Sequence, residues 1–149
     1  MIRDYRPEDL ALLLPLWLES TTRSHPFINP TYWQESEPLV RDQYIPNSET
    51  WVYEVEGAIV GFISVMEQRF VGALFVHHRW HGKGVGVALM THVQQRFPVL
   101  SLEVYEQNLR ACAFYQKLGF SPVKRTFPAE TNAPAQIMQW GKNGLTMSG

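Results

Sequence analysis

The sequence predicts an α+β domain in which a mixed, mostly antiparallel sheet is flanked by helices. Apolar residues repeat at helical spacing in the first third of the chain, but from Trp51 onwards they alternate with polar residues, as in a strand. Glu56-Gly57 separates two apolar runs and is typical of a tight hairpin turn. A length of 149 residues, of which 45% are hydrophobic, is enough for one domain with a filled core.

The first third predicts a short strand followed by two helices. Met1–Tyr5 suits the strand, and Pro7–Asp9 is a helix start with acids near the positive end of the helix dipole. A second helix is expected to begin at Asn29-Pro30. Pro15 and Pro38 lie inside these patterns and are expected to kink or end the helices, because proline lacks a backbone N–H.

The rest of the chain predicts six strands and two helices. Gly119 is expected to close the second helix in the left-handed conformation. We assign a single domain to residues 1–141 and a flexible tail to 142–149. The expected strands cover 51–55, 58–66, 70–76, 99–105, 122–127 and 135–140, and the expected helices begin near Val85 and Asn108.

Composition excludes several classes of protein. Lys plus Arg is 13 against 14 for Asp plus Glu, and a net charge of -1 argues against a nucleic-acid-binding protein. The apolar runs are far shorter than the roughly 20 residues that cross a bilayer, so no membrane association is expected. Cys112 is the only cysteine, which rules out an intramolecular disulfide and favours a cytoplasmic location.

A glycine-rich loop after the strand at 70–76 is the most informative element. Without Cβ atoms, Gly82, Gly84 and Gly86 let backbone N–H groups approach an anion at the start of a helix. The segment is not G-x-G-x-x-G, and Lys83 is not followed by Ser or Thr, so neither a Rossmann nor a Walker loop fits. The alternative is that the glycines only permit a tight turn between strand and helix.

Two ordered motifs resemble the GNAT superfamily of N-acetyltransferases. Residues 79–84 (Arg-Trp-His-Gly-Lys-Gly) match its Gln/Arg-x-x-Gly-x-Gly/Ala pyrophosphate signature on a strand, loop and helix. Residues 108–120 match its Asn-x-x-Ala-x-x-Phe-Tyr-x-x-x-Gly-Phe segment. More narrowly, the chain resembles small bacterial members that acetylate protein amines, through Trp-Leu-Glu-Ser-Thr-Thr and His-Pro-Phe-Ile near its N-terminus.

The resemblance implies acetyl-CoA as cosubstrate, held in a cleft between two parallel strands that splay apart. The backbone of residues 74–76 would pair with the pantetheine amides, and an N–H near Phe75 or Val76 would stabilise the oxyanion. Residues 82–87 would hold the pyrophosphate. The full set of expected cofactor contacts is Leu74, Phe75, Val76, Arg79, His81, Gly82, Lys83, Gly84, Val85, Gly86, Val87, Asn108, Ala111 and Tyr115.

The reaction needs a proton acceptor for the amine. A lysine ammonium is neutral in only about one molecule in 2,500 at pH 7. Many GNAT members carry a Glu on the strand before the glycine-rich loop, but residues 70–76 contain no acid. Glu103 on the next strand is our predicted catalytic base, and Glu67 and Glu106 are the other candidates. The alternative for Glu103 is a structural position, because a carboxylate on a strand more often faces water.

The leaving thiolate needs a proton donor, and Tyr115 matches the family's general-acid tyrosine. It lies seven residues after Asn108, which places both on a similar helix face. Without the family match, a tyrosine at this spacing is usually part of an amphipathic core.

The acceptor site is less well defined by the sequence. His25, Phe27 and Phe70 are our predicted substrate-binding residues. His77, His78 and His81 suggest a metal, but no nearby Cys or acid in the sequence completes a ligand set, so we predict none.

Together these observations predict an acetyl-CoA-dependent enzyme that acetylates a primary amine, with a protein lysine preferred. The alternatives are a protein N-terminal amine, a small amine, or a non-catalytic acyl-CoA sensor. The expected partners are acetyl-CoA and the acceptor protein or amine, with no nucleic acid and no membrane. A monomer or weak dimer is expected.

Overall fold

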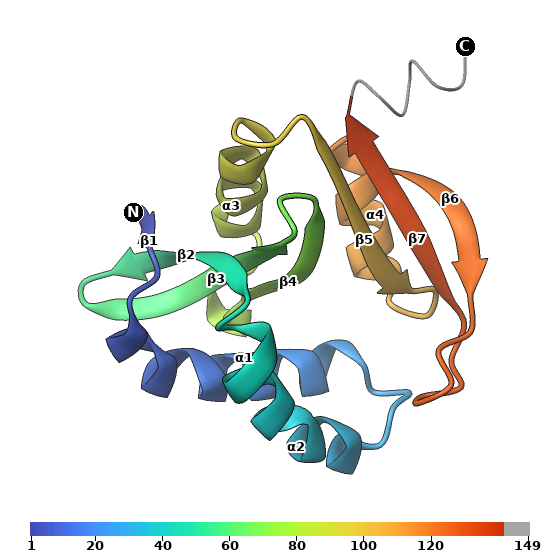
Figure 1. The fold of residues 1–149 in the computed structure, drawn as a ribbon, viewed down its shortest axis with the longest axis horizontal. Helices are drawn as coiled ribbons and strands as arrows, with labels where there is room; N and C mark the ends of the chain where they lie inside the picture. The colour runs from blue at the N-terminus through green and yellow to red at the C-terminus, as the bar shows by residue number, and fades with distance from the viewer. Residues whose placement is uncertain (142–149) are drawn as a thin grey trace.

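The computed structural model describes residues 1–141, which form a sheet in the order β1-β2-β3-β4-β5-β7-β6 with helices on both faces (Figure 1). The predicted tail, 142–149, lies outside the described residues. The strands are β1 (Ile2–Asp4), β2 (Ser48–Val55), β3 (Ala58–Met66), β4 (Phe70–Val76), β5 (Val99–Tyr105), β6 (Ser121–Thr126) and β7 (Ala135–Gly141). The helices are α1 (Leu10–Ser24), α2 (Pro30–Leu39), α3 (Val85–Gln94) and α4 (Leu109–Lys117), with short turns at Pro7–Asp9, Val40–Tyr44 and His78–Trp80.

Helix α1 passes through Pro15 without ending, so the expected interruption there is wrong. Proline leaves the carbonyl of Ala11 without its helical partner, but both residues are exposed and water can satisfy that oxygen. Leu13 and Trp17 on the opposite face are buried and hold the helix against the sheet. Pro38 does precede a change, because α2 ends one residue later in a π-helical turn.

The hairpin prediction is confirmed. Glu56 and Gly57 have φ angles of 50° and 82°, as a two-residue turn between β2 and β3 requires. The bounds of β3, β4 and β5 match the expected ones, while β2 begins three residues earlier, at Ser48 instead of Trp51.

The pair formed by β4 and β5 is parallel, whereas the other strand pairs among residues 1–141 are antiparallel. The register of β4 against β5 contains the single pair Phe70 and Ser101. Beyond it the two strands diverge, as Figure 1 shows between the green and ochre arrows. This confirms the expected splay and leaves backbone groups on the facing edges of both strands free of sheet hydrogen bonds.

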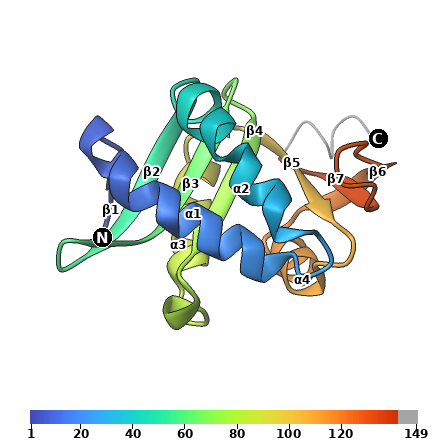
Figure 2. The same ribbon diagram turned by 90° about the horizontal axis from the view of Figure 1, so that it is seen from below.

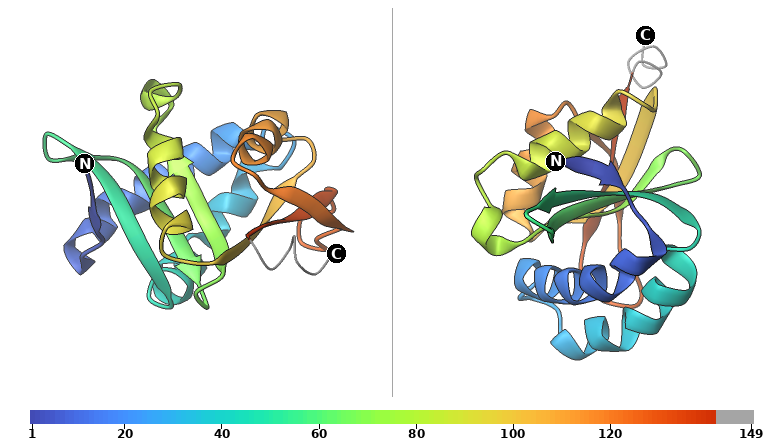
Figure 3. Two further views of the ribbon diagram at one scale, coloured as in Figure 1. Left: turned by 90° about the horizontal axis from the view of Figure 1, so that it is seen from above. Right: turned by 90° about the vertical axis from the view of Figure 1, so that its left-hand side faces the viewer.

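The helices form two layers around the sheet. In the right panel of Figure 3, α1 and α2 lie below the strands and α3 and α4 above them. Figure 2 shows α1 crossing under β2, β3 and β4. Leu13 and Phe62 belong to the core on the α1 side, and Leu89 and Leu102 to the core on the other side. No helix of residues 1–141 has both the length and the apolar character needed to span a bilayer.

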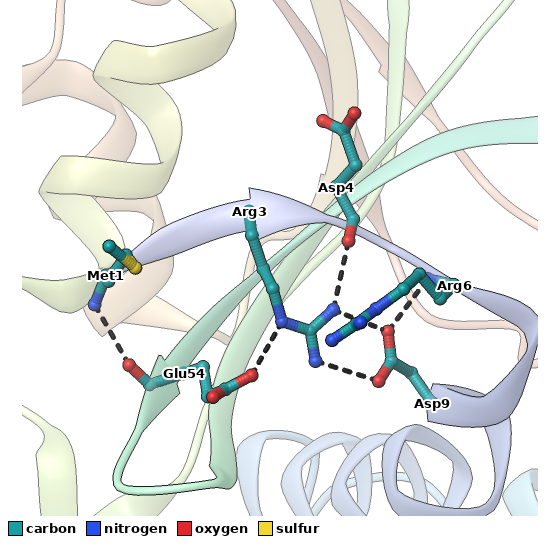
Figure 4. A network of polar contacts seen from close by, with 6 residues as sticks. All are labelled: Met1, Arg3, Asp4, Arg6, Asp9 and Glu54. Carbon is teal, nitrogen blue, oxygen red and sulfur yellow. Dashed lines mark hydrogen bonds and ion pairs between the residues drawn. The ribbon is translucent and has the colours of Figure 1, made fainter.

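An ion-pair network joins the N-terminal strand to the helix that follows it (Figure 4). Arg3 donates two hydrogen bonds to Asp9, at 2.8 and 2.9 Å, and a third to Glu54 of β2 at 2.6 Å. The bonds from Arg3 lower the pKa of Asp9 to about 2. The network fixes the start of α1, the helix that ends at His25.

Candidate active site

A cavity of about 750 Å³ opens where β4 and β5 diverge. Its walls come from both strands, from the loop before α3, from α4, and from α1 and α2 on the other face of the sheet. It therefore joins the glycine-rich loop to the two N-terminal helices, so that a donor and an acceptor can meet within one space.

The glycine-rich loop has the backbone that its sequence requires. Gly82 and Gly84 have φ angles of 75° and 85°, in the left-handed region that favours glycine. Gly84 is also the N-cap of α3, whose first N–H groups and dipole favour an anion. A Cβ on Gly86 would lie 3.2 Å from the ring of Phe114, so this glycine permits close packing of α3 and α4.

Most of the predicted cofactor residues lie on the cavity wall. Arg79 and Lys83 are exposed and do not, and the Lys83 ammonium lies 5.8 Å from the ring centre of Trp80. His81 donates from Nε2 to the carbonyl of Val76 at 2.9 Å, because a carbonyl can only accept, and so joins the loop to the end of β4. The predicted residues on the wall are Leu74, Phe75, Val76, His81, Gly82, Gly84, Val85, Gly86, Val87, Asn108, Ala111 and Tyr115.

Asn108 caps α4 as the sequence predicts. Its side-chain oxygen accepts from the N–H of Ala111 at 3.2 Å. The cap occupies the amide oxygen, while the amide NH₂ group keeps two donors for a ligand in the cavity. Capping and cofactor binding are therefore compatible.

Tyr115 combines a packed ring with a hydroxyl that makes no hydrogen bond within residues 1–141. Its ring lies 5.4 Å from that of Phe114 and 5.8 Å from that of Phe120. Burial raises the pKa of Tyr115 to about 12, so the phenol keeps its proton at neutral pH. The residue lines the cavity, which suits a proton donor.

The three acids named from the sequence have different surroundings. Glu103 lines the cavity from β5 and is exposed, and Thr126 of β6 donates a hydrogen bond to its carboxylate at 2.7 Å. Glu106 is paired with Arg125 at 2.7 and 3.0 Å, which lowers its pKa. Glu67 lies in the β3–β4 turn, away from the cavity wall. Of the three acids, only Glu103 lines the cavity.

An aromatic cluster forms the acceptor side of the cavity. His25, at the C-terminus of α1, contacts the rings of Trp33, Tyr105 and Phe27, with centroids 5.1, 5.2 and 5.7 Å away. His25, Trp33 and Tyr105 line the cavity, whereas Phe27 packs behind them. Tyr105 was not predicted from the sequence as an acceptor-side residue. Tyr105 lies two residues after Glu103, and residues two apart on a strand share a face, so this spacing was the available signal.

Phe70 lies elsewhere. It lines a smaller cavity of about 220 Å³, which shares Trp17, Gly72 and Ala73 with the wall of the main cavity. Of the three predicted substrate-binding residues, His25 lines the main cavity, Phe70 lines the smaller one, and Phe27 lines neither.

His77 and His78, which were considered as metal ligands from the sequence, lie beside an acid. Glu19 of α1 lies 3.1 Å from His78, and its carboxylate, His77 and His78 can each offer one ligand atom within 4.8 Å of the others. Sequence spacing did not reveal this acid, because it belongs to a helix far away in the chain. Glu19 and His78 contact each other directly, and His77 already accepts from the N–H of Arg79 at 3.1 Å.

Comparison with known proteins gives a consistent result. Residues 3–140 match the family model described as an acetyltransferase (GNAT) domain. The chain is 49% identical over 140 residues to the peptidyl-lysine N-acetyltransferase YiaC of Escherichia coli K12, covering 94% of this chain and 96% of that protein. It is 33% identical to the peptidyl-lysine N-acetyltransferase YjaB of Escherichia coli K12, covering 92% of each. The solution structure of apo-form YjaB from Escherichia coli superimposes with a TM-score of 0.81, covering 95% of this chain and 98% of that one.

Proposed function

Because the chain belongs to the GNAT family of acetyltransferases, we propose that it moves the acetyl group of acetyl-CoA directly to the side-chain amine of protein lysines. The observation that carries this proposal is the cavity of about 750 Å³ that opens between the diverging strands β4 and β5. It has an anion-binding loop at one end and an aromatic wall at the other, so a thioester and an amine can be brought together without a covalent enzyme intermediate.

Backbone groups of the glycine-rich loop and of β4 would bind acetyl-CoA. The pyrophosphate of acetyl-CoA would lie against the N–H groups around Gly82 and Gly84, where the dipole of α3 favours negative charge. The pantetheine arm would run along the free edge of β4 and pair with backbone groups of Leu74 and Phe75. No phosphate-binding side chain is needed, which suits a chain with a net charge of -1.

The chemistry uses groups on both sides of the thioester. A neutral amine attacks the carbonyl carbon, a backbone N–H of β4 stabilises the oxyanion, and the carbon–sulfur bond breaks. The phenol of Tyr115 would donate a hydrogen bond to the leaving sulfur as its charge develops. Glu103, the base predicted from the sequence, lies on the cavity wall.

Two relatives named as peptidyl-lysine N-acetyltransferases, each aligned over most of both chains, support a protein lysine as acceptor. The alternatives remain a protein N-terminal amine, a small amine, or a sensor that binds acyl-CoA without transfer. The presence of Tyr115 on the cavity wall favours an enzyme over a sensor.

The test is an incubation of the purified protein with radiolabelled acetyl-CoA and three acceptors offered separately: a lysine peptide with a blocked N-terminus, a lysine-free peptide with a free N-terminus, and spermidine. Label in the first acceptor alone supports the proposal. Label in the second or third alone assigns a different amine, and cofactor binding without transfer to any acceptor supports the sensor.

A further inference from the structure

His25 is the histidine in the acceptor wall, and its ring is held in one orientation. It follows the last residue of α1, is 8% exposed, and packs against rings from α2 and β5. Burial of a charged or flexible side chain at this position would cost free energy, so packing alone does not explain why a titratable residue lies here.

The hydrogen bonds of His25 define its tautomer. Its Nδ1 lies 2.7 Å from the carbonyl oxygen of Thr21, and a carbonyl can only accept, so the proton of the neutral ring is on Nδ1. The hydroxyl of Thr21 lies 3.3 Å from the same nitrogen. The lone pair of the neutral ring is therefore on Nε2, which has no hydrogen-bond partner within residues 1–141. His25 is one of the residues that line the cavity.

The surroundings keep the ring neutral. Burial lowers the pKa of His25, and the bond to Thr21 opposes this only in part. Burial raises the pKa of Tyr32 of α2 and of Tyr105 of β5, so both are uncharged at neutral pH. The charged groups on the elements around the ring are Glu19 and Arg23 of α1, Glu35 and Glu37 of α2, and Glu103 of β5, and none of them is a cause of the shift at His25. The charges of Glu103 and Glu130 act on Tyr105 and are not among the causes of the shift at His25.

Glu103 is less well suited to the same task. Its carboxylate is exposed, so water stabilises its charge, and one of its oxygens already accepts from Thr126 at 2.7 Å. Burial lowers the pKa of His25, so its ring is neutral and can accept a proton at neutral pH. The exposed negative charge is better placed to attract an ammonium group from solvent.

We propose that Nε2 of His25, rather than the carboxylate of Glu103, receives the proton of the acceptor ammonium group. This rests on the proposed acetyl transfer to a lysine amine. Nε2 takes one proton from the ammonium group, which leaves a neutral amine. The amine nitrogen then bonds to the thioester carbon and loses its second proton to solvent. The carbon–sulfur bond breaks while Tyr115 donates a hydrogen bond to the sulfur, and the thiolate then takes a proton from solvent. The imidazolium returns its proton to solvent, so the cycle releases one proton.

The aromatic wall has a complementary effect on the substrate. Trp33 and Tyr105 surround the path of the lysine side chain with apolar ring surface, which favours its methylene groups and disfavours its charge. The lysine ammonium group therefore loses its proton more easily as it enters the acceptor side of the cavity, where His25 lies.

His25→Asn is the variant that tests this proposal. The Asn side-chain NH₂ can replace Nδ1–H as donor to Thr21, so the local fold is kept while the basic nitrogen is lost. We expect kcat/KM for a blocked lysine peptide at pH 7 to fall by about 10²- to 10⁴-fold, the range for a positioned base. Acetyl-CoA affinity and melting temperature should stay at the parent values, and the deficit should shrink as the pH approaches 10 and the lysine deprotonates unaided.

His92→Asn is the matched control. His92 on α3 is also a histidine whose pKa is lowered by burial, but it packs on Trp51 outside the cavity, so its replacement should leave the rate unchanged. Glu103→Gln should raise the KM of the cationic peptide and leave the acid side of the pH profile at the parent position.

Several results overturn the proposal. One is a His25→Asn rate within threefold of the parent at pH 7. Another is a rate that stays equally low at pH 10 in folded protein, because that indicates positioning instead of proton transfer. If His25→Asn does not fold, the tautomer of His25 in the parent protein is measured by NMR instead. A proton on Nδ1 supports the proposal, and a neutral ring with the proton on Nε2 refutes it. Absence of lysine transfer by the parent protein refutes the proposed function itself.

Discussion

Replacement of Tyr115 by Phe removes one oxygen from the centre of the proposed mechanism. The ring contacts with Phe114 and Phe120 survive the change, and within residues 1–141 the hydroxyl has no hydrogen bond to lose. We therefore expect the melting temperature and the acetyl-CoA dissociation constant to match those of the parent. A change of this kind separates the chemistry of the hydroxyl from the packing of the ring.

The size of the expected loss follows from the phenol's acidity. Burial raises the pKa of Tyr115 to about 12, whereas an ordinary thiol has a pKa of about 8.5. A proton transfer from the phenol to a free thiolate is thus uphill by roughly 3.5 units, or about 5 kcal/mol. The phenol acts mainly by hydrogen bonding to the sulfur as its charge develops, and a bond to a charged group contributes about 1.5 to 3 kcal/mol. We expect turnover to fall by about 10- to 150-fold.

The assay is the initial rate of acetyl transfer to a blocked lysine peptide at saturating acetyl-CoA, measured from pH 6 to 10. The parent rate should show no decline on the alkaline side from loss of the Tyr115 proton, because that group stays protonated until about pH 12. A Tyr115→Phe rate within twofold of the parent, on folded and saturated protein, would refute the assignment as proton donor and leave Tyr115 as a packing residue.

Three further changes test other parts of the account. Gly84→Glu places a negative side chain at a residue with φ of 85° beside the pyrophosphate site, so acetyl-CoA affinity measured by calorimetry should fall by about 1 to 3 kcal/mol; an unchanged affinity removes the loop from the site. Glu103→Gln should raise the KM for a lysine peptide several-fold with a smaller change in kcat, and a loss confined to kcat that recovers at high pH would return the base to Glu103. The pKa of Asp9 is lowered to about 2 by Arg3, so this pair stabilises the fold above about pH 4 and loses its effect as the pH falls toward 2. In urea unfolding, Asp9→Asn should cost about 1 to 2 kcal/mol at pH 7, allowing for partial solvent screening, and little at pH 2.

The elements that the sequence predicted well are those in which local rules and packing agree. The turn at Glu56-Gly57, the N-cap Asn108 and the glycine-rich loop each depend on a few neighbouring residues, and all three formed as expected. Pro15 was misjudged because the rule concerns the helix alone. The burial of Leu13 and Trp17 against the sheet outweighs one missing hydrogen bond on an exposed face.

The candidate site was predictable on its donor side and less so on its acceptor side. The loop and α4 are continuous motifs, so the places of Gly84, Asn108 and Tyr115 follow from short stretches of sequence. The aromatic wall brings together His25 from the end of α1 and Tyr105 from β5, and no spacing in the chain links them. The same is true of Glu19 beside His78.

The most direct test of the central claim is the identity of the amine that carries the label. The parent protein is incubated with acetyl-CoA and a mixture of bacterial proteins, and the products are digested and examined by mass spectrometry. We predict new acetyl groups on lysine side chains, dependent on active protein and reduced with Tyr115→Phe. Acetyl groups found on protein N-termini alone, or on no protein at all while acetyl-CoA is consumed with a small amine, would contradict the account.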